Sequence, residues 1–415
     1  MNPGFTQDQD YAMQVLQQGY NVFLTGDAGT GKSFLLREFV AWASQQTPPR
    51  RVLCTATTGI AAQNIDGRTI HSAVKWSPKL NLSNDWEIDF ESKAEALKRS
   101  DILIVDEISM MTPSFLRFLL KCIQRASPIQ IIFIGDFFQL PPVKCSQYAF
   151  EAPEWKALRL FPIILRSVVR QGSQEFVQLL RQLRHGDVNA LYAIQSRSAK
   201  HLIEDAICLC AHVDKADCIN GEKMDMLSGP YFEFPADINQ PIADEDWKET
   251  TLSKRLKLKT GARVLITANN YAEKYCNGSM GVLLSEPRWS TIKRQEVLPV
   301  RLDRDGRTVE IPRITANIDT GIAGESCRIS QFPIVPAYAI TIHKSQGQTF
   351  DRVNIIDGCC WDNGQLYVAL SRARSLDGLF ISSDVEAEHV KASSVVVDFY
   401  KHCFPWLYKT PNDPT

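Results

Sequence analysis

The eight residues Gly26–Ser33, GDAGTGKS, restrict the fold of this chain more than any other stretch. They satisfy the G-x-x-x-x-G-K-[ST] phosphate-loop pattern and lie between the apolar run NVFLTG and the helical pattern FLLREFVAWA. A glycine-rich turn between a buried strand and a helix presents backbone N–H groups to phosphate. We expect Lys32 to reach the β- and γ-phosphates of a nucleoside triphosphate and Ser33 to bind Mg²⁺. The predicted phosphate loop comprises Gly26, Asp27, Ala28, Gly29, Thr30, Gly31, Lys32 and Ser33.

The sequence around this loop predicts an α/β fold. Four short apolar runs in the first 165 residues, NVFLTG, RVLCTAT, DILIVDE and IQIIFIGD, are each followed by polar or glycine-rich residues and then by a helical pattern. That order is typical of a parallel sheet with helices on both faces. The chain has 415 residues, which favours two or three domains.

The alternation of apolar runs and helical patterns is interrupted twice along the chain. Residues 76–98 interrupt the first alternating block, so we expect a small insertion there. A second alternating block begins near FPIILRSVVRQ and resumes at FPIVPAYAITIH, and short strands with Gly, Asn and Asp turns lie between its halves. We therefore predict a first domain over 1–162, a second over 163–251 and 331–415, and an inserted β-barrel or β-sandwich over 252–330.

Composition excludes several classes of protein. The net charge of −1 argues against a wholly basic nucleic-acid-coating protein but leaves a local basic groove open. No apolar run is long enough to cross a bilayer, and the first ten residues lack the pattern of a signal peptide. The 11 cysteines include no C-x-x-C pair, which favours a reducing, cytoplasmic setting. Zinc ligation by Cys208, Cys210, His212 and Cys218 is an alternative to simple core packing of the cysteines.

Two adjacent carboxylates supply the chemistry that the phosphate loop needs. Asp106 and Glu107 follow four apolar residues, so both emerge at the carboxyl end of a predicted strand, where ligands bind in such sheets. We predict that Asp106 holds Mg²⁺ and that Glu107 orients and deprotonates the attacking water. A solvent-facing acidic pair at the end of a strand is the alternative.

Further polar residues complete a candidate ATP site. Gln139 in IIFIGDFFQLPPV can sense the γ-phosphate, while Asp136 more simply supports the turn. The amide of Gln9 can both donate and accept, which suits the edge of adenine. Arg170 and Arg372 are candidates to stabilise charge in the transition state from across a cleft. Taken alone, Gln9 is by default a surface glutamine, and Arg170 and Arg372 are each more often solvated helix arginines.

The ordered motifs resemble those of superfamily 1B DNA helicases, most closely the Pif (petite integration frequency) family, with the RecD and Dda helicases as more distant relatives. The motifs are FTQDQ, GDAGTGKS, TATTGIAAQNI, GRTIHS, DEISMM, GDFFQLPPV, LRSVVRQGSQEFVQLLRQLRHGD, TIHKSQGQTF and YVALSRARSLDGL. They extend from about residue 5 to residue 380. Val169 departs from the aromatic residue that often precedes the arginine of the VFRQ motif.

The resemblance implies two RecA-like P-loop domains, with a small wedge insertion in the first and a β-barrel-like insertion in the second. It implies ATP and Mg²⁺ as cofactors and ATP-driven 5′-to-3′ translocation on single-stranded DNA with duplex unwinding. Carried onto this sequence, Arg170 and Arg372 become arginine fingers, and Gln346 and Gly347 meet the nucleotide. We expect a monomer of bacterial or phage type, acting on single-stranded DNA and on junctions of single and double strands, with G-quadruplexes and RNA–DNA hybrids as further candidates.

A translocase must hold the DNA backbone without reading its sequence. The expected contacts lie in loops at the ends of strands. They are Thr58, Thr69, His71, Lys75, Phe138 and Val143 in the first domain and Thr341, His343 and Lys344 in the second. Phe137 and Phe138 can equally pack in the core. The sequence leaves two other outputs open, a DNA-binding ATP switch that does not unwind and an RNA translocase.

Overall fold

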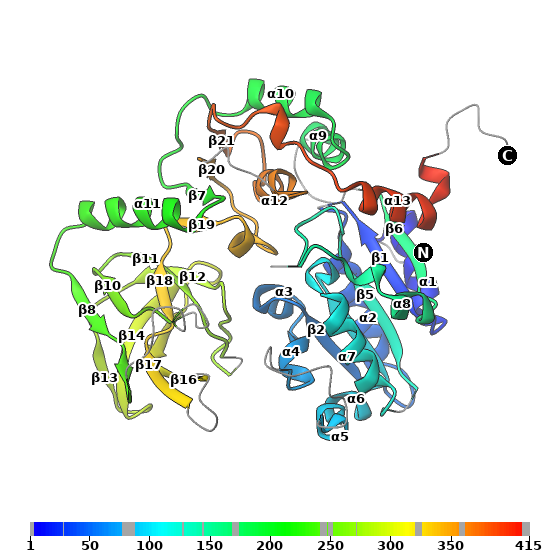
Figure 1. Cartoon of the computed structure of the whole chain (residues 1–415), viewed down its shortest axis with the longest axis horizontal. Helices are drawn as coiled ribbons and strands as arrows, with labels where there is room; N and C mark the ends of the chain where they lie inside the picture. The colour runs from blue at the N-terminus through cyan, green and yellow to red at the C-terminus, as the bar shows by residue number, and fades with distance from the viewer. Residues whose placement is uncertain are drawn as a thin grey trace. The chain divides into compact units, whose positions relative to one another are not determined.

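The structure is a computed structural model that describes residues 4–27, 29–76, 88–126, 128–142, 145–167, 174–240, 247, 252–270, 272–319, 326–356 and 362–408. The chain divides into two compact units (Figure 1). The first unit contains residues 1–204 and 346–415, and the second contains residues 205–345. The second half of the chain is therefore shared between the two units.

A six-stranded parallel sheet forms the centre of the first unit, with the strand order β3-β2-β4-β5-β1-β6. Its strands are β1 (Val22–Gly26), β2 (Val52–Ala56), β3 (Arg68–Thr69), β4 (Ile102–Asp106), β5 (Gln130–Ile134) and β6 (Phe161–Leu165). The four apolar runs predicted as strands in this region are thus β1, β2, β4 and β5. The prediction of an α/β fold with a parallel sheet is confirmed.

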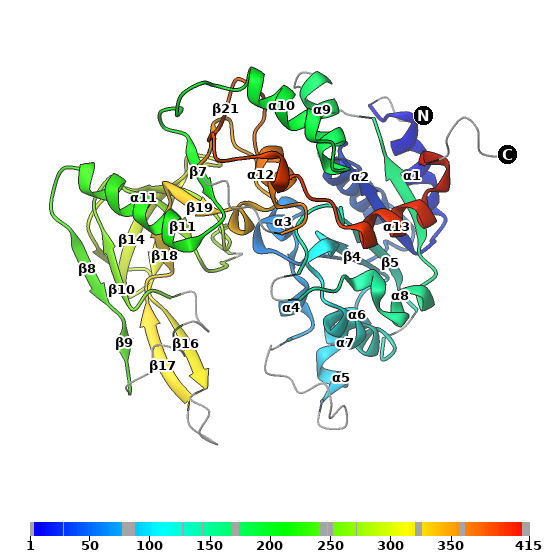
Figure 2. The same ribbon diagram turned by 45° about the horizontal axis from the view of Figure 1, so that its top comes forward.

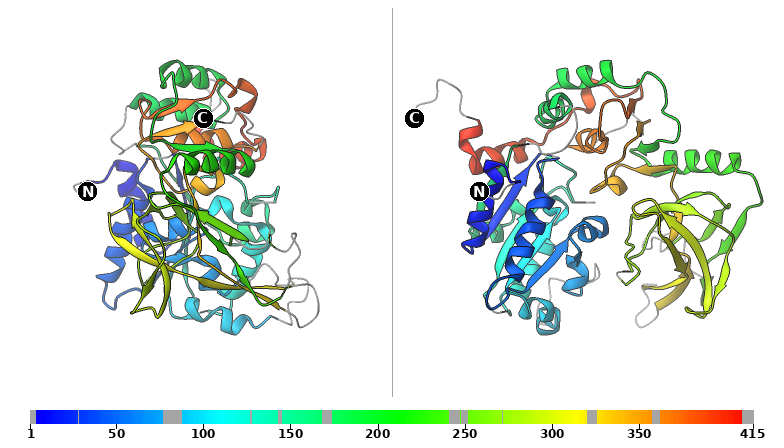
Figure 3. Two further views of the ribbon diagram at one scale, coloured as in Figure 1. Left: turned by 90° about the vertical axis from the view of Figure 1, so that its left-hand side faces the viewer. Right: turned by 180° about the vertical axis from the view of Figure 1, so that it is seen from behind.

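Helices cover both faces of this sheet because successive side chains of a strand point to opposite sides (Figure 3). Val22 and Leu24 of β1 lie in one core with residues of α1 (Gln7–Gln17) and α2 (Lys32–Ser44). Phe23 points the other way, with its ring centroid 5.6 Å from Trp155 of α8 (Pro153–Ala157) and 5.8 Å from Phe399 of α13 (Ser394–Cys403). Strand β1 is thereby buried on both sides.

Shorter elements complete the first unit. They are α3 (Gly59–Asn64), α4 (Ile70–Ala73), α5 (Phe90–Lys93), α6 (Glu95–Lys98), η2 (Ile108–Met110), α7 (Pro113–Ile123), η3 (Ala149–Glu151), α9 (Gln174–Arg184), α10 (Val188–Arg197), β20 (Val353–Ile355), α12 (Gln365–Ser371), β21 (Leu379–Ile381), η6 (Ala387–His389) and η7 (Pro405–Leu407). Strands β20 and β21 pair in parallel. In the predicted insertion at 76–98, residues 77–87 lie outside the described part, and α5 and α6 follow them.

Strand β6 differs from the expectation that FPIILRSVVRQ opens the second block. It pairs in parallel with β1 along its whole length, from Phe161 opposite Val22 to Leu165 opposite Gly26. The first sheet therefore extends past residue 162, where we expected the first domain to end. An apolar run alone does not specify which sheet it joins.

The second unit combines a parallel pair of strands with antiparallel sheets. The pair consists of β7 (Ile207–Cys210) and β19 (Ala339–Thr341), beside α11 (Val213–Met226). An antiparallel sheet has the order β13-β14-β12-β11-β18 with β15 on β14, and smaller sheets are formed by β10-β8 and β16-β17-β9, whose long β16–β17 hairpin is seen in Figure 2. The antiparallel insertion is confirmed in this form, while its closure into a barrel stays a prediction.

The remaining bounds of the second unit are β8 (Phe232–Pro235), β9 (Asp237–Ile238), β10 (Arg255–Leu258), β11 (Arg263–Ile266), β12 (Met280–Leu283), β13 (Arg288–Ser290), β14 (Gln295–Leu302), β15 (Thr308–Pro312), β16 (Ile314–Asp319), β17 (Ser326–Gln331), β18 (Ile334–Pro336) and η5 (His343–Ser345). Their inward side chains form a core that includes Leu258, Val264, Leu298 and Phe332.

None of the described helices has the length and apolarity needed to cross a membrane. Within the described part of the chain, no group of three or more His, Cys, Asp or Glu side chains is placed to hold a metal ion. Cys208 and Cys210 lie instead on buried positions of β7, which is the core-packing alternative.

Candidate nucleotide-binding site

A cavity of about 390 Å³ lies at the carboxyl edge of the first sheet, entirely within the first unit. It forms there because β1, β4 and β5 are parallel, so that the loops that follow them all begin at the same edge of the sheet. Predicted site residues that line it are Gly29, Gly31, Lys32, Ser33, Asp106, Glu107, Gln139, Gly347 and Arg372. Residues more than 300 positions apart in the chain, such as Lys32 and Arg372, are thus brought to one site.

The phosphate loop has the backbone that its glycines allow. Gly31 adopts a left-handed φ of 80° and is the N-cap of α2, with no side-chain cap. The first N–H groups of a helix have no intrahelical acceptors, so the start of α2 suits an anion. The Nζ of Lys32 donates to the carbonyl oxygens of Gly26 and Asp27, at 2.7 and 3.0 Å. Two carbonyl groups of the phosphate loop therefore fix the ammonium group of Lys32, which lines the cavity.

Asp106 and Glu107 emerge at the end of β4 as predicted, and Asp106 is buried while Glu107 is half-buried. Glu107 adopts a left-handed φ of 53° and ψ of 46°, a conformation that costs free energy in a residue with a side chain. The backbone N–H of Glu107 donates to Asp106 Oδ1 (2.8 Å), and Thr57 Oγ1 donates to the carbonyl oxygen of Glu107 (2.7 Å). The strained turn is thus fixed from both sides.

Burial raises the pKa of both carboxyl groups. The pKa of Asp106 rises to about 7, first because of burial and then because of the charge on Glu107. Burial also raises the pKa of Glu107, and the charges of Arg372 and Lys32 oppose that rise. A cavity lined by two acidic side chains this close together is suited to a cationic partner.

The donor set fits a nucleotide with Mg²⁺. Among the described residues, Glu107 Oε2, Gln139 Oε1 and Gln346 Oε1 are buried oxygens without a hydrogen-bond partner. Because buried polar atoms are normally satisfied, these oxygens indicate that the site takes a polar ligand. The Asp106 carboxylate and the Ser33 hydroxyl offer the oxygen ligands that Mg²⁺ prefers.

Two of the other predicted nucleotide contacts, Arg372 and Gln346, form hydrogen bonds within the protein. Arg372 lies at the end of α12, where Nη1 donates to Gln348 O (3.1 Å) and Nε donates to Val368 O (3.0 Å). The amide of Gln346 donates to Ser109 Oγ at 3.4 Å. Ala28 and Arg170 lie outside the described residues.

Gln9 lies beside the phosphate loop and does not line the cavity. It is fully buried, accepts from the backbone N–H of Thr6 (3.0 Å) and donates to Thr30 O (3.0 Å). Its amide therefore supports the loop in this structure, and its contact with adenine stays a prediction.

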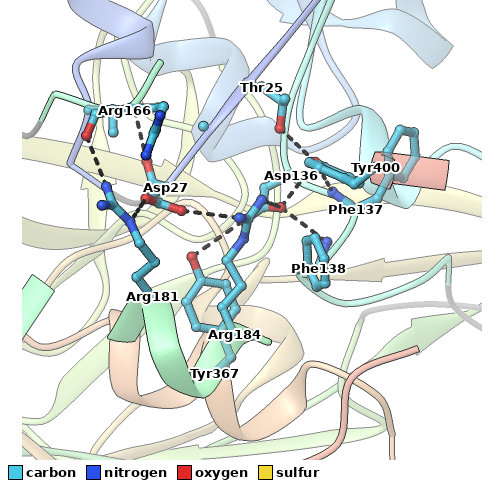
Figure 4. A network of polar contacts seen from close by, with 12 residues as sticks. Thr25, Asp27, Asp136, Phe137, Phe138, Arg166, Arg181, Arg184, Tyr367 and Tyr400 are labelled. Carbon is cyan, nitrogen blue, oxygen red and sulfur yellow. Dashed lines mark hydrogen bonds and ion pairs between the residues drawn. The ribbon is translucent and has the colours of Figure 1, made fainter. Parts of the chain in front are cut away.

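A polar network under the cavity was not predicted from the sequence (Figure 4). Arg181 and Arg184 of α9 both bind the carboxylate of Asp27, and Arg184 also binds Asp136. The i, i+3 spacing of the two arginines in RQLR was a usable signal for a shared helix face. Their partners could not be identified because Asp27 lies 154 positions before Arg181. Arg37 of α2, which lines the cavity, was also missed.

Four predicted DNA contacts belong to the first unit near β3. Thr58 and Thr69 are N-caps, and their hydroxyls accept from Ala61 N (3.2 Å) and Ser72 N (3.3 Å). The other two, His71 and Lys75, interact with side chains of the first unit. His71 stacks on Phe115 at 4.3 Å between ring centroids, and Lys75 pairs with Glu95 at 3.2 Å.

The other predicted DNA contacts fall into three groups. Phe138 is buried against Arg184 and Tyr400, so the core-packing alternative describes it, and Val143 lies outside the described residues. Thr341, His343 and Lys344 belong to the second unit, and Thr341 Oγ1 accepts from Lys344 N at 3.4 Å. Phe137 is fully buried as well.

Comparison with known proteins decides the family. Residues 4–205 match the family described as AAA domain, and residues 336–376 match the UvrD-like helicase C-terminal domain. The ATP-dependent DNA helicase Pif1 of Campylobacter jejuni is 31% identical over 92% of this chain and 94% of its own length. The chain belongs to the Pif1 family of DNA helicases. The resemblance carried by the motifs is thereby confirmed.

Other Pif1 proteins match with different coverage. The ATP-dependent DNA helicase PIF1 of Danio rerio is 33% identical over 95% of this chain, which spans 63% of the length of that relative. The crystal structure of Bacteroides Pif1 bound to ssDNA matches with a TM-score of 0.79 and 29% identity, covering 96% of each chain. The structure of Pif1 helicase from Candida albicans gives the same TM-score and identity, covering 96% of this chain and 98% of that one.

Proposed function

We propose that this Pif1-family chain is an ATP-dependent DNA helicase that moves 5′ to 3′ on single-stranded DNA and unwinds duplexes. The observation that carries the proposal is that one cavity is lined by five of the predicted site residues, Lys32, Ser33, Asp106, Glu107 and Arg372. The helicase names of the relatives and the ssDNA bound to the Bacteroides protein support the same reading.

In this proposal the loop residues hold the triphosphate and the carboxylates act on water. Lys32 exchanges its contacts with the loop carbonyls for the β- and γ-phosphates, and Glu107 accepts the proton of the attacking water. Gln139 senses the γ-phosphate, while Arg372 and Arg170 stabilise the charge that develops on it. Ser33 and Asp106 would hold Mg²⁺, which offsets phosphate charge when bound.

The proposed DNA path uses loops of both units. In the first unit it comprises Thr58, Thr69, His71 and Lys75, and in the second it comprises Thr341, His343 and Lys344. The segment 339–350 is divided between the units after Ser345, so its DNA-facing residues and its nucleotide-facing residues, Gln346 and Gly347, lie on opposite sides of that division. We assign this segment to the coupling of ATP hydrolysis to movement.

The proposed substrates are single strands and their junctions with duplexes, with G-quadruplexes and RNA–DNA hybrids as further candidates. A Pif1 structure with forked dsDNA among the relatives supports junctions. The proposed RecA-like and inserted domains follow the ranges 1–162, 163–251 with 331–415, and 252–330, except at the first boundary. Because β6 belongs to the first sheet, that boundary moves to a point after Leu165. A monomer in the cytoplasm of a bacterial or phage-infected cell is the proposed setting.

Unwinding of tailed duplexes tests the proposal. Wild-type protein with ATP and Mg²⁺ is mixed with a duplex that carries either a 5′ or a 3′ tail, and strand separation is followed by stopped-flow fluorescence. We expect separation only with the 5′ tail, and none in the Glu107→Gln variant. DNA-stimulated ATPase without strand separation would identify an ATP switch, and stronger stimulation by RNA would identify an RNA translocase.

A further inference from the structure

Arg184 of α9 is a buried cation with two carboxylate partners. Its side chain is 3% exposed, and arginine is seldom buried to this extent unless it is paired. Nε and Nη2 donate to the two oxygens of Asp136 at 3.0 and 2.7 Å, and Nη1 lies 3.1 Å from Asp27 Oδ1. Figure 4 shows the guanidinium between the two carboxylates. The forked group thus binds Asp136 in a bidentate manner and still reaches Asp27.

Each carboxylate belongs to a different loop of the nucleotide cavity. Asp27 is the second residue of the phosphate loop, directly after β1. Asp136 follows Gly135 and precedes Gln139 by three residues, and Gly135 and Gln139 both line the cavity. Arg184 itself does not line it. One guanidinium therefore connects the loop of Lys32 with the loop of Gln139 without lining the cavity itself.

The surrounding groups keep Asp136 ionised and in place. Tyr367 and Tyr400 donate to its two oxygens, each at 3.3 Å, and the backbone N–H of Phe138 donates at 3.1 Å. The pKa of Asp136 is lowered, because the charge and hydrogen bonds of Arg184 outweigh the effect of burial. The guanidinium carbon also lies 4.3 Å from the ring centroid of Phe138. This degree of support leaves Arg184 little freedom to move independently of the Gln139 loop.

Arg181, on the same face of α9, also binds Asp27 of the phosphate loop, and its side chain is partly exposed. Nε of Arg181 donates to Asp27 Oδ2 at 2.6 Å, and its Nη2 donates to Arg166 O at 2.9 Å. Asp27 is thus bound by two guanidiniums, one partly exposed and one buried. A buried ion pair contributes little net stability compared with apolar packing. Stability alone therefore does not explain Arg184, and the second role to test is to fix the positions of the loops that carry Asp27 and Asp136.

We propose that Arg184 is a positioning residue for ATP hydrolysis, which sets the spacing between the phosphate loop and the Gln139 loop. The inference rests on the proposed ATPase function, since its consequence is the alignment of Lys32 with Gln139 at the terminal phosphate. Arg184 touches neither nucleotide nor water in this role. It acts through Asp27 and Asp136, and Arg181 assists it at Asp27.

The test compares Arg184→Lys with wild type and with Arg197→Lys, a matched change of a partly exposed arginine on the neighbouring helix α10. Lysine keeps the charge but cannot make the bidentate bridge, so the fold is retained while the loops lose their common anchor. We expect kcat for ATP to fall by about 100-fold, as a small misplacement of reacting groups can cause. The Kd for a fluorescent ATP analogue should stay within roughly threefold, because binding by the loop itself is retained.

Amide hydrogen exchange gives a readout that does not depend on hydrolysis. In Arg184→Lys, peptides covering the phosphate loop and the Gln139 loop should both exchange faster, and Arg197→Lys should change neither. A double variant, Arg184→Met with Asp136→Asn, removes the buried Arg184–Asp136 pair as a unit, leaves Asp27 paired with Arg181, and keeps a folded protein available for the same measurements. It should also show the loss of kcat.

The outcomes separate the inference from the proposed function. Wild-type kcat in folded Arg184→Lys, or faster exchange in only one loop or in neither, would overturn the positioning role. Absence of ATPase activity in the wild-type protein would instead remove the proposed function, while the exchange of the two loops would still report whether Arg184 anchors them. A lower Tm with unchanged kinetic constants would reduce Arg184 to a purely structural residue.

Discussion

The hydroxyl groups of Tyr400 and Thr25 lie 2.6 Å apart and join the C-terminal helix α13 to β1, which lies inside the parallel sheet. Tyr400 is fully buried, and its hydroxyl also donates to Asp136 and accepts from the backbone N–H of Phe137 at 3.3 Å. Its pKa is raised, mainly by burial and by the charge of Asp136, so the phenol stays protonated at neutral pH. Helix α13 is therefore tied through Tyr400 to β1 and to the loop of Asp136.

Replacing Tyr400 with Phe should destabilise the first unit. The change removes the side-chain partner of the Thr25 hydroxyl and the acceptor of the Phe137 N–H, and an unsatisfied buried group costs about 1–3 kcal/mol. Asp136 loses one hydrogen bond and keeps those from Arg184 and Tyr367. Urea unfolding followed by tryptophan fluorescence measures the loss. Tyr192→Phe is the matched control because that ring is 54% exposed on α10, and it should change stability by less than about 0.5 kcal/mol. Equal stability of both variants would contradict the bridging role of the Tyr400 hydroxyl.

Local patterns were sufficient to predict that several of the candidate site residues lie at one edge of the first sheet. The runs before Gly26 and Asp106 have the length and apolarity of buried parallel strands, and the residues that follow such strands meet at one edge of the sheet. The presence of Lys32, Glu107 and Gln139 in one cavity follows from that geometry. Arg372 follows α12 and reaches the cavity from a later part of the chain, so the strand pattern does not predict it. The motif order added the family, which the comparisons confirm.

Long-range pairing could not be predicted in the same way. The run at Phe161–Leu165 looks like any buried strand, and only its pairing with β1 shows that it completes the first sheet. Phe138 fitted DNA stacking and core packing equally well, until Arg184 and Tyr400 were found against its ring. The partners of Arg184 come from loops far away in the sequence, so no local pattern contains them.

Glu107→Gln should separate nucleotide binding from hydrolysis. The amide keeps the size of the side chain but cannot accept a proton from water, so kcat should fall by at least about 100-fold while an ATP analogue still binds. Lys32→Ala should abolish hydrolysis too, because the phosphates lose their cation. ATPase assays and fluorescence titration provide both numbers. Glu388→Gln, a change at an exposed side chain, is the control, and appreciable turnover in Glu107→Gln would remove Glu107 as the base.

His71 should make the stability of the first unit depend on pH. Burial against Phe115 lowers the pKa of His71 below its usual 6.5, so the folded state takes up a proton less readily than the unfolded chain. Stability should therefore decrease as the pH falls below about 6.5, and be largest above that value. His71→Gln should lose less Tm than wild type between pH 7 and pH 5, whereas the exposed His201→Gln should follow wild type. Parallel curves for wild type and His71→Gln would show that His71 does not contribute to the dependence.

Lys344→Ala tests whether the segment after β19 couples DNA to ATP hydrolysis. Lys344 is in η5 of the second unit, and the nucleotide cavity belongs to the first, so removing its charge should leave the cavity intact. We expect the basal ATPase rate to be nearly unchanged and the stimulation by single-stranded DNA to fall. DNA binding should become weaker and less salt-dependent, since the proposed phosphate contact of Lys344 is removed. Titration of ATPase activity with oligothymidine at several salt concentrations measures each quantity. The exposed Lys215→Ala on α11 is the matched control and should behave as wild type. Equal loss of basal and stimulated activity in Lys344→Ala would contradict the coupling role, because it would place the effect of Lys344 in the ATPase step itself.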